Sequence, residues 1–233
     1  MAKRPETLHE ERTIVYDEAH WKTLADLRAR AIDVMESLQA AGIQSFVYGS
    51  IARGDISKTS DIDIIVPNPI SSYRLEVTLG KGIHRELVQA TPTMVLKGHV
   101  YLKQDLTVTF PLFKFRSREI EFYQWGGKIG IQELQDDIRV QGVDKRLIFI
   151  DPNESGHVER GVIGYEHEVA RELGVSVEIA QERVRVLTRR DSVGRTGVYL
   201  TRPLTDDEGF EEVAKTIVDS DPAIRRTAER RGG

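Results

Sequence analysis

The sequence predicts an α/β fold, because segments with helical periodicity alternate with short apolar segments of strand character. Apolar side chains recur near helical spacing over residues 19–41, and Gly42 ends that segment. Two apolar runs follow at residues 45–48 and 62–66, and Pro67 closes the second. A chain of 233 residues with a hydrophobic fraction of 39% can bury one substantial core and a smaller second one.

The next part of the chain continues this alternation. Residues 71–89 are expected to form a helix that is weakened around Gly80 and Gly82. Residues 93–102 and 106–115 are rich in β-branched and aromatic side chains, so we expect two strands there.

The remaining elements are predicted from the same patterns. Residues 131–141 have the pattern of a helix and residues 146–150 that of a strand. Two helices are then expected at residues 165–173 and 176–190, and a strand at residues 198–201 follows a glycine turn. The order helix, turn, helix, turn and strand marks the C-terminal third as a separate part of the chain.

Charge and composition exclude several classes of protein. Charged residues make up 30% of the chain and the formal net charge is -4, so a strongly basic nucleic-acid-binding coat is excluded. Cysteine is absent, which excludes disulfides, thiolate metal sites and cysteine nucleophiles. No segment approaches the roughly 18 apolar residues of a membrane span, and the N-terminus has no apolar signal core. We therefore expect a soluble, cytoplasmic protein.

The stretch VYGSIARGDISKTSDIDIIVP, residues 47–67, carries the chemistry. A strand that ends in Gly49 and Ser50 and leads into a helix offers free backbone N–H groups to a phosphate. Gly49 lets the backbone approach the phosphate closely, and Ser50 adds a hydroxyl donor. Arg53 is expected to pair with oxygens of a triphosphate. This half of the motif predicts a nucleotide-binding site.

Two aspartates supply the other half of the motif. Residues i and i+2 of a strand face the same side, so Asp61 and Asp63 project together while Ile62 and Ile64 lie buried behind them. Two carboxylates at this spacing repel each other unless cations lie between them. Oxygen-rich sites of this kind suit Mg²⁺, which takes its other ligands from water and substrate phosphates. The pair therefore predicts a divalent metal site.

The glycine-serine turn and the two aspartates together resemble the GS…DxD signature of the polymerase beta-like nucleotidyltransferases. The resemblance implies a palm with a mixed sheet and flanking helices. It also implies a metal-dependent enzyme that carries two Mg²⁺ or Mn²⁺ ions on Asp61 and Asp63. Such an enzyme transfers a nucleoside monophosphate from a nucleoside triphosphate to a hydroxyl acceptor and releases pyrophosphate.

The same resemblance implies a third carboxylate on a nearby strand, which binds metal and helps to activate the acceptor hydroxyl. We favour Asp105 for this role, because it opens an apolar strand that ends in proline. Glu119 and Glu121, in the stretch SREIEFYQWGG, are the alternatives.

The aromatic residues of that stretch are candidates for contact with the nucleotide. The segment EFYQWGGKIGIQEL resembles the aromatic-glycine turn and helix that cradle the sugar and base in polymerase beta. This resemblance makes Phe122, Tyr123 and Trp125 candidates for stacking on the nucleotide.

The C-terminal third resembles the winged helix-turn-helix domains of nucleic-acid-binding regulators. Its helix, Gly-Val-Ser turn, helix, glycine turn and strand follow the order of that fold. Four arginines on or near the second helix and the wing are suited to phosphate and base contacts: Arg183, Arg189, Arg190 and Arg195. We therefore expect a nucleic-acid acceptor, with tRNA, other RNA or DNA as candidates.

Four consecutive segments are expected. They are an N-terminal tail and helix (residues 1–42), the palm (43–153), a winged-helix-like module (154–204) and a C-terminal helix with a polar tail (205–233). Two alternatives stay open: the same chemistry on a protein or small-molecule acceptor, and a non-catalytic winged-helix regulator that senses a nucleotide. Metal-dependent turnover of a triphosphate would separate the enzymes from the regulator.

Overall fold

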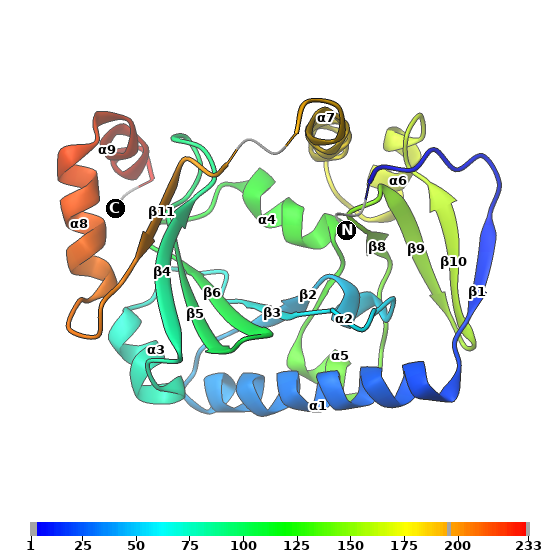
Figure 1. The fold of residues 1–233 in the computed structure, drawn as a ribbon, viewed down its shortest axis with the longest axis horizontal. Helices are drawn as coiled ribbons and strands as arrows, with labels where there is room; N and C mark the ends of the chain where they lie inside the picture. The colour runs from blue at the N-terminus through cyan, green and yellow to red at the C-terminus, as the bar shows by residue number, and fades with distance from the viewer. Residues whose placement is uncertain (1–3, 195–196, 232–233) are drawn as a thin grey trace. The chain divides into compact units, whose positions relative to one another are not determined.

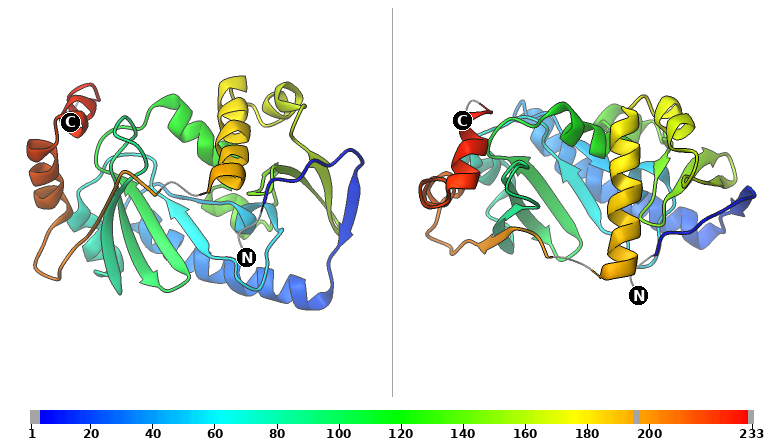
Figure 2. Two further views of the ribbon diagram at one scale, coloured as in Figure 1. Left: turned by 45° about the horizontal axis from the view of Figure 1, so that its top comes forward. Right: turned by 90° about the horizontal axis from the view of Figure 1, so that it is seen from above.

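The computed structural model describes residues 4–194 and 197–231, and its ribbon is drawn in Figure 1 and Figure 2. The chain divides into two compact units that interleave along the sequence. The first unit takes its described residues from the ranges 1–32, 47–60 and 117–196, and the second from 33–46, 61–116 and 197–233. The units therefore do not follow the four consecutive segments expected from the sequence.

The second unit is built on a mixed sheet. Its strands lie side by side in the order β11 (Leu200–Pro203), β4 (His84–Gln89), β5 (Lys97–Lys103), β6 (Leu106–Pro111) and β3 (Ile62–Ile65). β3 runs parallel to β6, whereas β6 with β5, β5 with β4, and β4 with β11 are antiparallel pairs. Helices α3 (Ser72–Leu79), α8 (Phe210–Ser220) and α9 (Pro222–Glu229) belong to the same unit. The mixed sheet with flanking helices that the sequence predicts is confirmed.

One face of this sheet is apolar and packed. Ile62 and Ile64 are fully buried, which matches the alternation expected for this strand. On the same face Phe110 meets Phe210 of α8 edge to face, with ring centroids 4.9 Å apart. Gly98 leaves room for this pair, because a Cβ atom there would lie 2.4 Å from the ring of Phe110. The opposite face is therefore the one available for chemistry.

The helix predicted at residues 71–89 ends early. α3 stops at Leu79, and the backbone then takes positive φ at Gly80 (76°) and Gly82 (71°). Positive φ is costly for residues other than glycine, so these two glycines end the helix and turn the chain. Residues 84–89 form β4 instead, with side chains that alternate between buried and partly exposed.

The first unit contains a second, smaller sheet. Its strands are antiparallel and lie in the order β1 (Arg12–Val15), β10 (Gly156–Gly161), β9 (Ile148–Asn153) and β8 (Gly142–Val143). Strand β2 (Phe46–Tyr48) pairs with β7 (Lys128–Ile129) through Val47 and Tyr48. The helices α2 (Ser50–Arg53), α4 (Ser117–Trp125), α5 (Ile131–Gln135), α6 (Glu166–Glu172) and α7 (Val177–Val193) complete this unit. The long helix α1 (Glu18–Ala40) begins in the first unit and ends in the second.

The core of the first unit joins its sheet to α6 and α7. Trp125 and Phe149 are buried in this core together with Val169 and Leu173 of α6 and Ala180 of α7. The two helices therefore pack on the small sheet. Two helices were expected in this part of the chain, and the structure confirms both.

The predicted wing of the helix-turn-helix is wrong. The strand expected there is β11, and it pairs antiparallel with β4 of the second unit, from Leu200 opposite Gln89 to Pro203 opposite Glu86. An edge strand satisfies its backbone hydrogen bonds by joining a neighbouring sheet, and β11 joins the sheet of the second unit, whereas α6 and α7 belong to the first. The predicted wing arginine, Arg195, lies outside the described residues.

None of the helices in the described part of the chain is both long and apolar enough to cross a membrane.

Candidate active site

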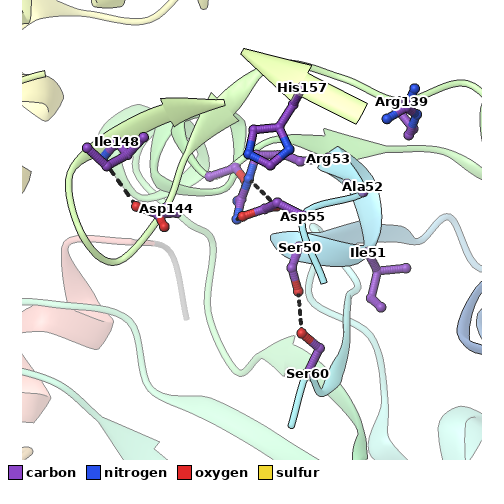
Figure 3. A network of polar contacts seen from close by, with 12 residues as sticks. Ser50, Ile51, Ala52, Arg53, Asp55, Ser60, Arg139, Asp144, Ile148 and His157 are labelled. Atoms are coloured by element: carbon purple, nitrogen blue, oxygen red, sulfur yellow. Dashed lines mark hydrogen bonds and ion pairs between the residues drawn. The ribbon is translucent and has the colours of Figure 1, made fainter. Parts of the chain in front are cut away.

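The glycine-serine turn is shaped by an unusual backbone conformation. Gly49 has φ 82° and ψ -145°, in a region that side-chain-bearing residues rarely adopt, and its N–H donates to the carbonyl of Gly127 at 2.9 Å. The short helix α2 starts at the next residue, Ser50. The hydroxyl of Ser50 donates to the hydroxyl of Ser60 at 3.2 Å, as Figure 3 shows. The Ser60 oxygen also accepts the N–H of Ser57 at 2.8 Å, which ties the following loop to this turn.

Arg53 lies at the end of α2, and its guanidinium is fully engaged. Nε and Nη2 donate to the two carboxylate oxygens of Asp55 at 2.9 and 3.0 Å, and Nη1 donates to the carbonyl of Gly126 (Figure 3). The side chains of the pair are only 5% and 6% exposed. Gly127 leaves space for this arginine, since a Cβ atom there would lie 2.8 Å from its Cγ. Arg53 therefore holds the turn together, and its expected contact with a triphosphate stays a prediction.

A second buried arginine supports α2 from α1. Arg28 is 3% exposed and donates to the carbonyls of Ile51 and Ala52 at 3.1 to 3.2 Å. Burial lowers the pKa of Arg28 to about 10, and the cation lies against carbonyls at the C-terminal end of the short helix. Sequence analysis missed this residue. Its position on the same helical face as Leu24 and Ala31 was the available indication.

The two aspartates lie where the sequence places them, at and just before β3. Asp63 is half-buried and Asp61 is exposed, while Ile62 and Ile64 are buried. Positions i and i+2 share one face of a strand, so both carboxylates belong to the face opposite the packed core. In the parallel pair of β3 and β6, Asp63 lies opposite Thr107.

The favoured third carboxylate comes from the neighbouring strand. Asp105 lies in the turn between β5 and β6, and its carbonyl accepts the N–H of Ile62 at 2.7 Å. Its main chain is therefore adjacent to that of Asp61. Among the described residues, no group of three or more His, Asp or Glu side chains lies close enough together to hold a metal ion. Asp105 as a metal ligand stays a prediction.

The alternatives for the third carboxylate, Glu119 and Glu121, lie on α4 of the first unit. Glu121 accepts hydrogen bonds from the hydroxyl and the N–H of Ser176, the residue that precedes α7. Its carboxylate therefore has a structural partner, because it holds the start of α7.

The aromatic residues of α4 are core residues. Tyr123 and Trp125 are each 3% exposed. Tyr123 packs edge to face against Tyr48, with centroids 4.8 Å apart, and Trp125 belongs to the core under α6 and α7. Both side chains therefore lie in the interior, on the buried face of α4, and their stacking on a nucleotide stays a prediction. Phe122 instead supports a cation, since the Arg183 guanidinium lies 4.9 Å from its ring centroid.

The arginines of α7 differ in their surroundings. Arg183 is half-buried, and burial together with the nearby charge of Arg190 lowers its pKa to about 10. Arg189 and Arg190 are exposed. Of the predicted nucleic-acid contacts on this helix, these two are therefore the ones that solvent reaches.

Sequence analysis also missed a polar cluster on β4 and β5. The phenol of Tyr101 donates to Glu86 at 2.6 Å, and His84 Nε2 lies 3.7 Å from the other oxygen of Glu86. Burial raises the pKa of Tyr101, as do the hydrogen bond to Glu86 and the charges of Glu86 and Asp63. The negative charge of Asp63 therefore contributes to the raised pKa of Tyr101. Because the sequence of β4 was taken for a helix, its alternation was not recognised as that of a strand.

Comparison with known proteins assigns the chain to a family. Neither a curated protein nor a solved structure matches the chain. A family model described as the nucleotidyltransferase domain matches residues 28–188, more than half of the chain. The matched span contains the glycine-serine turn, Asp61, Asp63 and Asp105. The expectation of a polymerase beta-like nucleotidyltransferase is thereby confirmed at the level of the family, and the chain belongs to the nucleotidyltransferase domain family.

Proposed function

We propose that this protein is a metal-dependent enzyme that transfers a nucleoside monophosphate from a nucleoside triphosphate to an acceptor hydroxyl. The observation that carries the proposal is the pair Asp61 and Asp63 on the polar face of β3, with a packed apolar face behind them. Family membership supports the reaction class. The glycine-serine turn supports it, because the conformation at Gly49 lets a phosphate approach the backbone closely where α2 begins.

The donor set fits a hard divalent cation. Mg²⁺ prefers carboxylate oxygens and keeps several waters, so two aspartates are enough when a triphosphate supplies the other ligands. Two cations held by Asp61 and Asp63 would neutralise charge on the phosphate oxygens. A third carboxylate would add to this metal site and help to activate the acceptor hydroxyl.

Each of the chain's own groups has a defined part in the reaction. The backbone that follows Gly49 at the start of α2 and the hydroxyl of Ser50 would orient the triphosphate. The acceptor oxygen bonds to the α-phosphorus, the bond from that phosphorus to pyrophosphate breaks, and the acceptor proton passes to a carboxylate. We propose Asp105 for this proton, because its turn joins β6 beside the start of β3.

The acceptor has two candidate classes. A nucleic acid was expected from the winged-helix resemblance, but the strand that would be the wing belongs to the sheet of the second unit. The exposed Arg189 and Arg190 on α7 keep RNA or DNA as the second candidate. The first candidate is a small molecule or a protein, because neither requires a winged-helix module.

Transfer of label tests the proposal. The protein is incubated with each nucleoside triphosphate labelled at the α-phosphate, with Mg²⁺ or with EDTA, and with total RNA, DNA, protein or small molecules. We expect Mg²⁺-dependent release of pyrophosphate and label in one acceptor fraction. Absence of both pyrophosphate and transferred label under every condition would refute the enzyme and favour the regulator.

A further inference from the structure

The first unit contains a pocket to which the proposed reaction gives no role. Its volume is about 380 Å³, and every residue that lines it belongs to the first unit. The lining comes from the segment that joins β1 to α1, from the loop after α2, from the turn before β9 and from β10. Small-molecule sites usually have volumes of about 300–1,000 Å³, whereas one water molecule occupies about 30 Å³. The pocket therefore has the size of a ligand site.

His157 of β10 is a buried polar residue in the wall of this pocket. Its side chain is 5% exposed, and Figure 3 shows its ring beside Arg53 and Asp55. Among the residues that the structure describes, none makes a hydrogen bond with the Nε2 atom of His157. Oε1 of Glu159 lies 3.6 Å from Nε2, which is too far for a hydrogen bond. Buried polar atoms are normally paired, so Nε2 is available to a bound molecule.

The neighbours of His157 determine which ring nitrogen carries the proton. Burial lowers the pKa of His157, so the imidazole is neutral at ordinary pH and carries one proton. The carboxylate of Glu159 draws that proton to Nε2. The hydroxyl of Tyr16 lies 2.6 Å from Nδ1, and burial raises the pKa of Tyr16, so this hydroxyl keeps its proton and donates it to Nδ1. Nε2–H is then a donor that requires an acceptor.

The charges in the wall favour a neutral ligand. Asp17 and Glu159 contribute carboxylates, which repel an anion such as a phosphate. Arg146 also lines the pocket and pairs with Glu159 at 2.5 Å, and its charge opposes a cation. Val15, which is 69% exposed, and Ile56 add apolar surface to the same wall. The pocket therefore suits a neutral molecule that has both an apolar surface and polar groups.

An aromatic pair in the wall favours a flat ligand. The rings of Tyr16 and His20 are stacked, with centroids 3.6 Å apart and planes 18° apart. Both residues line the pocket, and His20 is partly exposed, so Tyr16 does not cover the whole imidazole. A flat ring can extend such a stack by packing on the exposed part of His20.

We propose that this pocket binds the base of a nucleoside, at a site additional to that of the triphosphate. A nucleobase is neutral and flat, and its edges carry both hydrogen-bond acceptors and N–H donors. A ring nitrogen or carbonyl oxygen of the base accepts from Nε2 of His157. An N–H group of the base donates to a carboxylate of Asp17 or Glu159. The inference does not depend on the proposed function, because binding here requires neither metal nor phosphate.

Calorimetric titration of the whole protein tests the site. Adenosine, guanosine, cytidine and uridine are titrated one at a time, and ribose serves as the control that has no base. Each titration is repeated with Mg²⁺ and a saturating nonhydrolysable triphosphate, which fills the site of the proposed reaction. We expect at least one nucleoside to bind with a dissociation constant below about 1 mM, whether or not the triphosphate is present. Ribose should not bind.

Three variants make the result specific to His157. His157→Asn keeps a polar atom near the position of Nδ1 but removes Nε2, so it should weaken nucleoside binding about tenfold. His157→Gln places an amide nitrogen near the position of Nε2 and should bind within about threefold of the wild type. His167→Asn, at an exposed position of α6, is the matched control and should bind as the wild type does.

A fourth variant decides the matter if His157→Asn does not fold. Val15→Glu changes an exposed side chain of the wall, so the fold should be kept. Its added charge and bulk should weaken nucleoside binding about tenfold, because they replace apolar surface that packs on the base. A Val15→Glu protein that binds as tightly as the wild type would contradict the proposal.

Other outcomes overturn the nucleoside site directly. They are the absence of binding by all four nucleosides, loss of binding when the triphosphate is present, and a His157→Asn curve that overlays the His167→Asn curve. None of these results bears on nucleotidyl transfer, which is measured separately by the release of pyrophosphate. Failure of the proposed function is therefore distinguishable from failure of this site.

Discussion

Two regions of the molecule carry charged groups from the same sequence motif, and they use them in opposite ways. In the first unit, Arg53 and Asp55 form a bidentate ion pair whose side chains are 5% and 6% exposed. In the second unit, Asp63 is half-buried on the sheet face opposite the packed apolar core. The charges of the first region are buried and paired, whereas Asp63 is partly exposed to solvent.

The difference shows how to separate scaffold from chemistry within a motif. Burying a charge is costly unless it is paired, so a buried and paired group such as Arg53 stabilises the fold through its partner. A partly exposed carboxylate can be reached by a cation from solvent. Whether a charged residue of this motif stabilises the fold or binds a ligand depends on its burial and its ion-pair partner, not on its residue type.

The largest expected effect is a loss of activity, and it comes from a change at Asp63 in the second unit. Asp63→Asn should reduce nucleotidyl transfer at least several hundredfold, because loss of a metal or charge-stabilising element costs about 3 kcal/mol or more. Initial rates of pyrophosphate release measure this. Asp26→Asn, at an exposed position of α1, is the matched control and should keep wild-type rates. Wild-type activity in Asp63→Asn would remove this residue from the site.

The second largest expected effect is a loss of stability, and it comes from a change in the buried pair of Arg53 and Asp55. Arg53→Met should lower the free energy of unfolding by about 3–5 kcal/mol, because Asp55 is left buried without its partner. Urea denaturation measures the loss. Adding Asp55→Leu should recover part of it, since no charge then stays buried. If Arg53→Met keeps its stability and loses triphosphate affinity instead, the arginine contacts substrate after all.

The buried side chain of Trp125 provides a second test of the difference between buried and ligand-binding residues. Trp125→Ala should destabilise the fold by about 3–5 kcal/mol, because a large side chain leaves the packed core under α6 and α7. At a temperature where the variant is still folded, its affinity for the triphosphate should equal that of the wild type. A selective loss of affinity in a stable variant would instead support stacking on the nucleotide.

A smaller effect should appear in acid. Burial lowers the pKa of His99 to about 3, against about 6.5 in the unfolded chain. Between these values the unfolded state binds more protons, so stability falls as pH decreases below about 6.5, by up to about 1.4 kcal/mol per pH unit. His99→Gln should flatten this slope. Unfolding free energies measured at several pH values check it, and an unchanged slope would mean that other groups control the acid response.

Local spacing was enough to identify the chemistry. The alternation of Asp61 and Asp63 with Ile62 and Ile64 depends only on the two-residue repeat of a strand, which any strand imposes. The conformation at Gly49 is likewise a property of one residue, and the structure has it at positive φ. These features follow from covalent geometry, so the sequence alone predicted the family and the shared strand face of Asp61 and Asp63.

Features that depend on distant partners were decided only by the tertiary structure. Whether Arg53 meets a substrate or Asp55, and whether Trp125 stacks on a base or fills a core, depends on what packs around them. The strand β11 joins β4, more than a hundred residues earlier in the chain, instead of forming a wing. The pair of Tyr101 and Glu86 exists only because the register of β4 and β5 places the two side chains together. Burial and register arise from contacts between segments far apart in sequence, and no local pattern encodes them.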